Sequence, residues 1–186
     1  MDGAPPRPSP RLPVLRRGRG RAPSSRVTPR VWIDPSALDD ILVETVRTAP
    51  NETGGVLVGY GDVGGGFVVT AAVGPGPNAV HEPYRFVPDH ECHEREVARH
   101  YHASGRTETY LGDWHSHPTA AAYLSPRDRK TLRGIARERD ARAPTPLMMV
   151  VGGKPEGIGV WVLRPHTLPW FRRPVPCRLA HYDDED

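Results

Sequence analysis

Residues 111–128 read LGDWHSHPTAAAYLSPRD and contain two histidines one residue apart, then a proline, a serine and an aspartate. Successive side chains of a strand point to opposite faces, so His115 and His117 share a face and Ser116 points away from it. Pro118 cannot donate to a β-ladder, which predicts that the strand ends there. The stretch therefore predicts a strand, a loop and, from SPRD onward, a helix.

Two imidazoles on one strand face are a natural pair of zinc ligands, and catalytic zinc needs a third protein ligand. Asp128, eleven residues after His117, is the candidate for that third ligand. SPRD is also typical of a helix start, with Ser125 as the N-cap, Pro126 at the first helical position and Asp128 near the positive end of the helix dipole. Both interpretations stay open, because one aspartate can serve in both roles.

Strand and helix patterns alternate on either side of this stretch. Helical spacing places a set of apolar residues on one face of a first helix: Leu38, Ile41, Leu42, Val46 and Ala49. The expected helices are 35–49, 88–104 and 125–141, and the expected strands are 54–61, 66–74, 107–117, 146–151 and 157–163. This intermixing predicts an α/β fold with a mixed central sheet flanked by helices.

The length of 186 residues predicts one domain with tails. Residues 1–30 carry eight arginines against one acid and many prolines, which predicts a disordered tail. This tail is either simply solvated or contacts nucleic acid or an acidic partner through RRGRGR. The expected domain spans 31–163, and 164–186 is expected to be a C-terminal extension. Arginine outnumbers lysine 23 to 2, which indicates a GC-rich bacterial genome.

Several classes of protein and site are not expected. No apolar run has the length of a membrane span and nothing resembles a signal peptide, which predicts a cytoplasmic protein. Cys92 and Cys177 are too far apart in sequence to suggest a disulfide framework and are expected to be free thiols. The histidines of HECH (90–93) and HYH (100–102) are expected to be exposed on a polar helix. Trp114 is expected to pack in the core.

HSHPTAAAYLSPRD has the spacing His-x-His-Pro, six residues, Ser-x-x-Asp. This is the signature of the JAMM/MPN metalloproteases, which also have a glutamate upstream, at the start of a strand near the end of the first helix. Here NETGGVLVG supplies Glu52 in that setting. The chain resembles the bacterial branch of this family over residues 31–163. The resemblance implies the deaminase-like MPN fold, with a mixed sheet flanked by helices.

The resemblance also implies a role for each motif residue. One zinc ion would be held by His115, His117 and Asp128, with Glu52 as the general base. Ser125 would donate a hydrogen bond to the oxyanion that forms during hydrolysis. The alternatives are that Ser125 serves only as a helix cap and that Glu52 is an ordinary surface carboxylate.

The substrate implied by the resemblance is an amide or isopeptide bond after the C-terminal glycine of a ubiquitin-like protein. Cleavage would remove the modifier from a target or mature its precursor, with a place in bacterial anti-phage defence. The implied partners are the ubiquitin-like protein, its conjugates, and activation-like or conjugation-like enzymes. Neither nucleic acid nor a membrane is an expected partner.

Three alternatives remain. A protease that processes a sulfur-carrier protein would share the chemistry and differ only in substrate. RadC-like, DNA-associated proteins have a similar segment, but the sequence of that segment is closer to His-Asn-His-Pro-Ser-Gly. Glu52 within ETGG also argues against a RadC-like protein. A non-catalytic MPN scaffold usually lacks one or more ligands, whereas this chain has all of them.

Overall fold

The structure is a computed structural model that describes residues 28–62, 65–154, 156–164 and 172–181. Most of the predicted N-terminal tail, residues 1–27, lies outside the described residues. The helices are α1 (Pro35–Thr48), α2 (His90–Ala103) and α3 (Pro126–Ile135). The strands are β1 (Arg30–Ile33), β2 (Gly54–Gly61), β3 (Phe67–Val73), β4 (Val80–Glu82), β5 (Arg85–Val87), β6 (Thr109–His117), β7 (Leu147–Gly153), β8 (Glu156–Leu163), β9 (Pro174–Pro176) and β10 (Arg178–His181).

One mixed sheet organises the described residues, with the strand order β10-β1-β3-β2-β6-β7-β8-β9. Strand β1 is parallel to β10 and β3, β6 is parallel to β7, and the other neighbours are antiparallel. Strands β4 and β5 form a separate hairpin. The predicted mixed α/β class is confirmed. None of the described helices has both the length and the apolar character needed to cross a bilayer.

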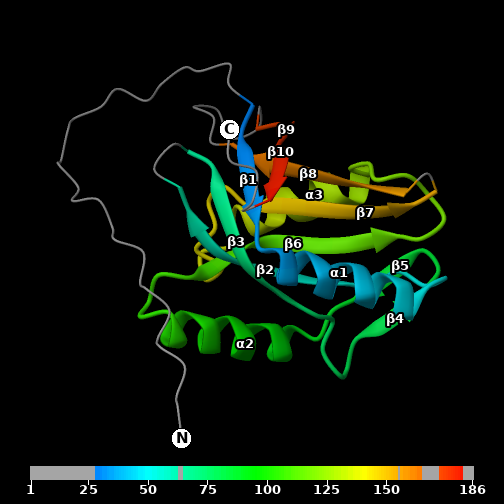
Figure 1. The fold of residues 1–186 in the computed structure, drawn as a ribbon, viewed down its shortest axis with the longest axis horizontal. Coiled ribbons are helices and arrows are strands. Elements are labelled where there is room, and N and C mark those ends of the chain that lie inside the picture. The colour runs from blue at the N-terminus through cyan, green and yellow to red at the C-terminus, as the bar shows by residue number, and fades with distance from the viewer. Residues whose placement is uncertain (1–27, 63–64, 155, 165–171, 182–186) are drawn as a thin grey trace, which may run out of the picture.

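Helices cover both faces of the sheet. On β7, Leu147 packs in the same cluster as Ala37 and Ile41 of α1, whereas its neighbour Met148 packs with Leu132 of α3. Because strand side chains alternate, α1 and α3 lie on opposite faces, as Figure 1 shows. Helix α2 packs on the α3 face through Val97, Val56 and Val58. Trp114 is buried in the cluster on the α1 face, as predicted.

The orientation of α1 differs from the predicted one. Leu42 and Val46, placed on the predicted apolar face, are 37% and 77% exposed. Ala37 and Ile41 form the buried part of the helix, and the inward stripe continues with Glu44 and other polar residues. The prediction followed the apolar residues, whereas the second half of α1 turns hydrogen-bonding side chains inward.

Five short strands were not predicted: β1, β4, β5, β9 and β10. Strands β4 and β5 lie in a segment of mixed polarity, and β9 and β10 lie in the segment expected to be a C-terminal extension. Strand β9 pairs with β8 at one edge of the main sheet, and β10 pairs with β1 at the other. The partner of β10 is distant in sequence, so no local pattern indicates that strand.

The glycine pair that opens β2 is explained by close packing. A Cβ on Gly54 would lie 2.5 Å from the carbonyl oxygen of Trp114, and a Cβ on Gly55 would lie 1.9 Å from that of Val73. Only glycine lets the neighbouring strands approach so closely. The register pairs Gly54 with His115, so the start of β2 lies beside the end of β6.

Leu57→Ala is expected to destabilise the fold by about 2–5 kcal/mol, because Leu57 is fully buried in the central strand β2 and its loss leaves a cavity. The measurement is urea unfolding of the metal-free protein. Val43→Ala is the control: Val43 is 65% exposed on α1, so a change within about 0.5 kcal/mol is expected. Equal effects of the two changes would contradict this description of the core.

Candidate metal centre

The two histidines of the HSHP segment lie at the end of β6 on the face covered by α3. His115 pairs with Gly54 on one side and with Val150 on the other. The Nε2 atoms of His115 and His117 are 3.1 Å apart. Both imidazoles therefore present a ring nitrogen to the same point, as the alternation of strand side chains predicts.

Asp128 meets these histidines from the first turn of α3. Its Oδ1 atom is 3.4 Å from Nε2 of His115, and its Oδ2 atom is 3.9 Å from Nε2 of His117. One ligand atom from each of the three residues lies within 4.8 Å of the others. The structure thus brings together the three residues predicted as metal ligands.

Asp128 also caps its helix. The Ser125 N–H donates to Oδ2 of Asp128 at 2.7 Å, and the Asp128 N–H donates to the Ser125 hydroxyl at 3.2 Å. This reciprocal pair is a capping box. The two interpretations of SPRD are therefore compatible, because the helix cap places the Asp128 carboxylate beside the histidines.

The electrostatics of the cluster suit a divalent metal. Burial acts to raise the pKa of Asp128, but hydrogen bonds from His115 and Ser125, together with the charge of His115, outweigh it and hold this pKa well below its usual range. Burial lowers the pKa of His117, and the neighbouring His115 adds to this effect. A charged carboxylate and a neutral imidazole are the forms that bind metals. Two imidazole nitrogens and one carboxylate oxygen are ligands that zinc accepts, so the residues fit a zinc ion.

Glu52 lies two residues before β2, next to the end of β6. Its backbone N–H donates to the carbonyl oxygen of Glu82 at 2.9 Å, and its carbonyl oxygen lies 3.0 Å from Nδ1 of His81. The β4–β5 hairpin, which supplies both contacts, lies at the end of the sheet where β2 begins (Figure 1). Burial raises the pKa of Glu52 and outweighs the opposing charge of His115, and the nearby charge of Asp128 adds to the increase. The carboxylate is therefore a better proton acceptor than an ordinary surface glutamate.

Aromatic residues border the cluster. The ring centroids of Tyr123 and His117 are 5.1 Å apart, and the Tyr123 side chain is half exposed. Tyr84, in the turn of the β4–β5 hairpin, is more exposed still, and its carbonyl oxygen accepts a hydrogen bond from Arg127 of α3. No sequence pattern indicates this border, because Tyr84 and Arg127 come together only in the folded chain.

The histidines of α2 do not join the cluster. His90 and His102 are exposed on α2, as predicted, whereas His100 is partly buried. The prediction was wrong for His93, which is buried with Nε2 2.9 Å from the carbonyl oxygen of Gly74. Among the described residues, no second group of three or more potential ligands comes together.

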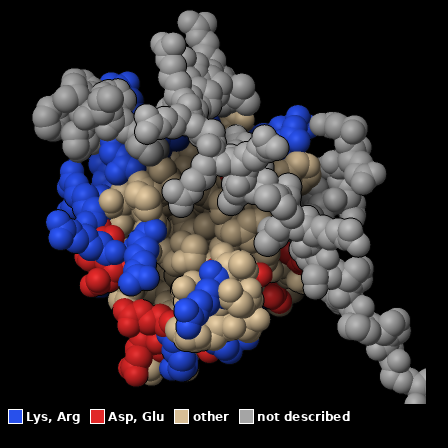
Figure 2. Space-filling model, turned by 90° about the vertical axis from the view of Figure 1, so that its left-hand side faces the viewer, with Lys and Arg blue, Asp and Glu red and all other residues tan. Residues whose placement is uncertain are grey.

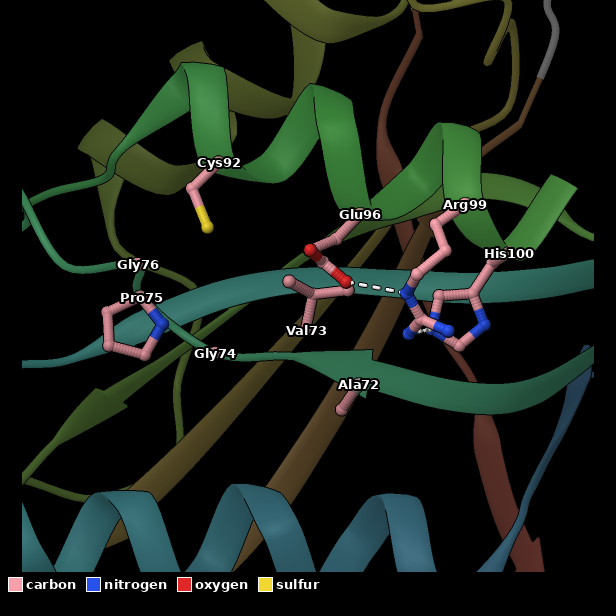
Figure 3. A pocket seen from close by; sticks show the side chains of 9 residues that line it. All are labelled: Ala72, Val73, Gly74, Pro75, Gly76, Cys92, Glu96, Arg99 and His100. Carbon is pink, nitrogen blue, oxygen red and sulfur yellow. Dashed lines mark hydrogen bonds and ion pairs between the residues drawn. The ribbon is translucent and has the colours of Figure 1, made fainter. Parts of the chain in front are cut away.

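A hollow of about 340 Å³ lies between α2 and the end of β3 (Figure 3). An ion pair between Glu96 and Arg99 lies along it, with a separation of 2.8 Å. Its lining residues are Ala72, Val73, Gly74, Pro75, Gly76, Cys92, Glu96, Arg99 and His100, none of which was predicted to belong to the site. Both cysteines are free thiols, as predicted. The hollow therefore provides no part of the metal cluster.

Comparisons with known proteins agree with this geometry. Residues 34–164 match the family described as prokaryotic homologs of the JAB domain. The chain is 40% identical over 127 residues to a protein of Sinorhizobium fredii named probable metalloprotease y4qB, covering 68% of this chain and 77% of that protein. It is 28% identical over 130 residues to a CD-NTase/cGAS isopeptidase of Enterobacter hormaechei, covering 68% of this chain and 69% of that protein.

The fold also has a solved counterpart. The solution structure of protein DSY2949 from Desulfitobacterium hafniense superposes with a TM-score of 0.59 at 16% identity, covering 81% of this chain and 92% of that one. This likeness concerns the fold alone. The family match spans well over half of the chain and includes all five predicted site residues, which confirms the predicted JAMM/MPN relationship. The chain belongs to the family of prokaryotic homologues of the JAB domain.

Proposed function

We propose that this protein is a zinc-dependent isopeptidase or peptidase that cleaves the amide bond after the C-terminal glycine of a ubiquitin-like protein. The observation that carries the proposal is the convergence of the His115 and His117 Nε2 atoms on the Asp128 carboxylate, at separations of 3.1–3.9 Å. The relatives' names, metalloprotease and isopeptidase, support a hydrolase of the JAMM type.

The proposed chemistry assigns a step to each residue. A zinc ion held by His115, His117 and Asp128 would supply the Lewis acidity that activates water at neutral pH. Glu52 takes a proton from the attacking water and delivers it to the departing amine. Its raised pKa suits this exchange, because the proton must be both accepted and released.

Ser125 is proposed to stabilise the oxyanion in addition to capping α3. Its hydroxyl oxygen accepts the Asp128 N–H. A hydroxyl has one donor hydrogen and two acceptor lone pairs. The hydrogen bond of the Ser125 side chain to the Asp128 carboxylate uses the donor hydrogen in this structure, and in the proposed mechanism that hydrogen turns to the oxyanion. The capping role and the proposed catalytic role therefore use different parts of one hydroxyl group.

Ser125→Ala is expected to lower kcat by about 10²–10³-fold, because an oxyanion donor is lost. Loss of the cap is expected to cost about 1 kcal/mol of stability as well. Steady-state kinetics and thermal unfolding measure the two effects separately. Ser125→Asp retains the cap but has no hydroxyl donor, so it should restore stability and not kcat. Recovery of kcat in Ser125→Asp would contradict the oxyanion role.

The substrate side of the proposal rests on the border of the site. The β4–β5 hairpin is a separate two-stranded sheet, and its backbone contacts Glu52 directly. An extended C-terminal tail can pair with such a strand edge, which would lead its last residue to the metal. Exposed Tyr84 and Tyr123 offer apolar surface along this approach.

The decisive experiment incubates the purified, zinc-loaded protein with a ubiquitin-like protein fused through its C-terminal Gly-Gly to a reporter, with and without a zinc chelator. Intact-mass spectrometry should show cleavage after the terminal glycine that the chelator abolishes. Cleavage of sulfur-carrier fusions alone would favour the alternative protease. Zinc binding without cleavage of any fusion would favour the non-catalytic scaffold.

The remaining predictions belong to the proposal. They are a cytoplasmic location, activation-like and conjugation-like enzymes as partners, and a role in anti-phage defence. The isopeptidase relative, whose name refers to CD-NTase and cGAS, supports a conjugate as substrate. On the face shown in Figure 2, basic and acidic side chains of the described residues are interspersed around an area of other residues. That mixture does not favour the phosphate backbone of DNA as a ligand of this face.

A further inference from the structure

Ser116 lies between the two histidines of the metal cluster, and its side chain is fully buried on the opposite face. Its N–H donates to the carbonyl oxygen of Thr53 at 2.8 Å, and its hydroxyl accepts the Thr53 N–H at 3.0 Å. In a regular antiparallel pair the second bond would go to the backbone carbonyl. Here the hydroxyl of Ser116 replaces that carbonyl as the acceptor, just before β2 begins and next to Glu52.

Thr53 is also held from α1. It is fully buried, and its hydroxyl donates to Oε1 of Glu44 at 3.1 Å. The same carboxylate accepts from Thr48 at 2.8 Å and from Arg47 at 2.8 and 2.9 Å. Burial acts to raise the pKa of Glu44, but these hydrogen bonds outweigh it and lower the pKa. Glu44 is therefore a charged anchor behind Thr53.

Glu52 precedes Thr53 directly, and its backbone is fixed on its other side by the β4–β5 hairpin through Glu82 and His81. Of the residues that the structure describes, none donates a hydrogen bond to the Glu52 carboxylate. The backbone of this residue is thus anchored, while its side chain remains available for chemistry.

We propose that Ser116, supported by Thr53 and Glu44, is a positioning residue that holds Glu52 at the metal cluster. The inference rests on the proposed function, in which Glu52 is the base. Because Ser116 sits between the two histidines in the chain, its hydroxyl ties the base to the same strand that carries the ligands. A displacement of about 1 Å at a reacting group can cost about 10²-fold in rate, so a direct link of this kind affects kcat.

The first test needs no activity. In Ser116→Ala the Thr53 N–H loses its acceptor, and amide exchange measured by NMR on the zinc-free protein should be about 5- to 10-fold faster at Thr53 than in the wild type. Ser116→Thr keeps a hydroxyl and should exchange at close to the wild-type rate. Unchanged exchange in a folded Ser116→Ala protein would overturn the proposal.

The second test is kinetic, with the Gly-Gly reporter fusion as substrate. Ser116→Ala should lower kcat by about 10- to 100-fold, with KM within about twofold and zinc content unchanged, and Ser116→Thr should recover kcat. Thr53→Val removes only the bond to Glu44 and should lower kcat as well, whereas Thr53→Ser should not. This pair keeps the question decidable if Ser116→Ala does not fold.

Ser104→Ala is the matched control. The Ser104 hydroxyl also accepts a backbone N–H, from Glu108 at 3.0 Å, but it lies at the end of α2, away from the cluster. The kcat of the Ser104→Ala variant should equal that of the wild type. Loss of zinc from Ser116→Ala, or wild-type kcat in that variant, would overturn the positioning role. A wild-type protein that cleaves no fusion would instead refute the proposed function, while the exchange result at Thr53 would still be informative.

Discussion

Glutamine in place of Glu52 is expected to lower kcat by about 10²–10⁴-fold while zinc content stays at the wild-type level. The amide has nearly the shape of the carboxylate but cannot accept the proton from water. The backbone of residue 52 is held by Glu82 and His81 through main-chain atoms, so the substitution leaves these contacts intact. Steady-state cleavage of the reporter fusion and elemental mass spectrometry measure the two quantities.

The control for this prediction is Glu94→Gln. Glu94 is exposed on α2, so the same chemical change there should leave kcat unchanged. Because Glu52 is partly buried and Glu94 is exposed, the pair compares a carboxylate in the site environment with one at the surface. A glutamine variant at position 52 with more than about a tenth of the wild-type kcat would exclude Glu52 as the general base.

Alanine in place of His117 is expected to abolish both metal binding and cleavage. The wild type should carry about one zinc per chain, because a catalytic site uses three protein ligands, and the variant keeps only two of them. Zinc at about 100 times its Kd should stabilise the wild type by about 2.7 kcal/mol, and this gain should vanish in the variant. Elemental mass spectrometry and unfolding with and without zinc test both statements.

His102→Ala is the matched control for the metal. His102 is exposed near the end of α2, so its loss should change neither zinc content nor cleavage. A His117→Ala protein that still binds one zinc per chain would show that the metal lies elsewhere. A folded wild type that binds no zinc when it is offered would leave SPRD as a helix cap only, and the domain as a binding module.

The sequence predicted the local parts of the site well, for a physical reason. Strand alternation places His115 and His117 on one face whatever the rest of the fold does. The capping box of Ser125 and Asp128 likewise depends only on residues three apart. Both features follow from backbone geometry over a few residues, so they can be predicted from the local sequence alone.

The sequence was less informative where orientation depends on packing. For α1 the apolar spacing placed Leu42 and Val46 on the predicted face, yet both side chains are exposed. In place of these apolar residues, the second half of α1 turns polar side chains inward, and Glu44 accepts hydrogen bonds there from Thr48 and Thr53. Helical periodicity records which residues share a face, but the tertiary partners decide which face is buried.

Only the tertiary structure decided how the separate parts meet. Glu52 and Asp128 are far apart in the chain, and no local pattern sets the register that pairs Gly54 with His115. The hydrogen bond between Glu52 and the β4–β5 hairpin and the hydrogen bond from the Thr53 N–H to the Ser116 hydroxyl are also contacts between distant parts of the chain. By itself the sequence determined the residue types, the strand face and the helix cap. Their convergence required the folded sheet, because it depends on strand pairing between distant segments.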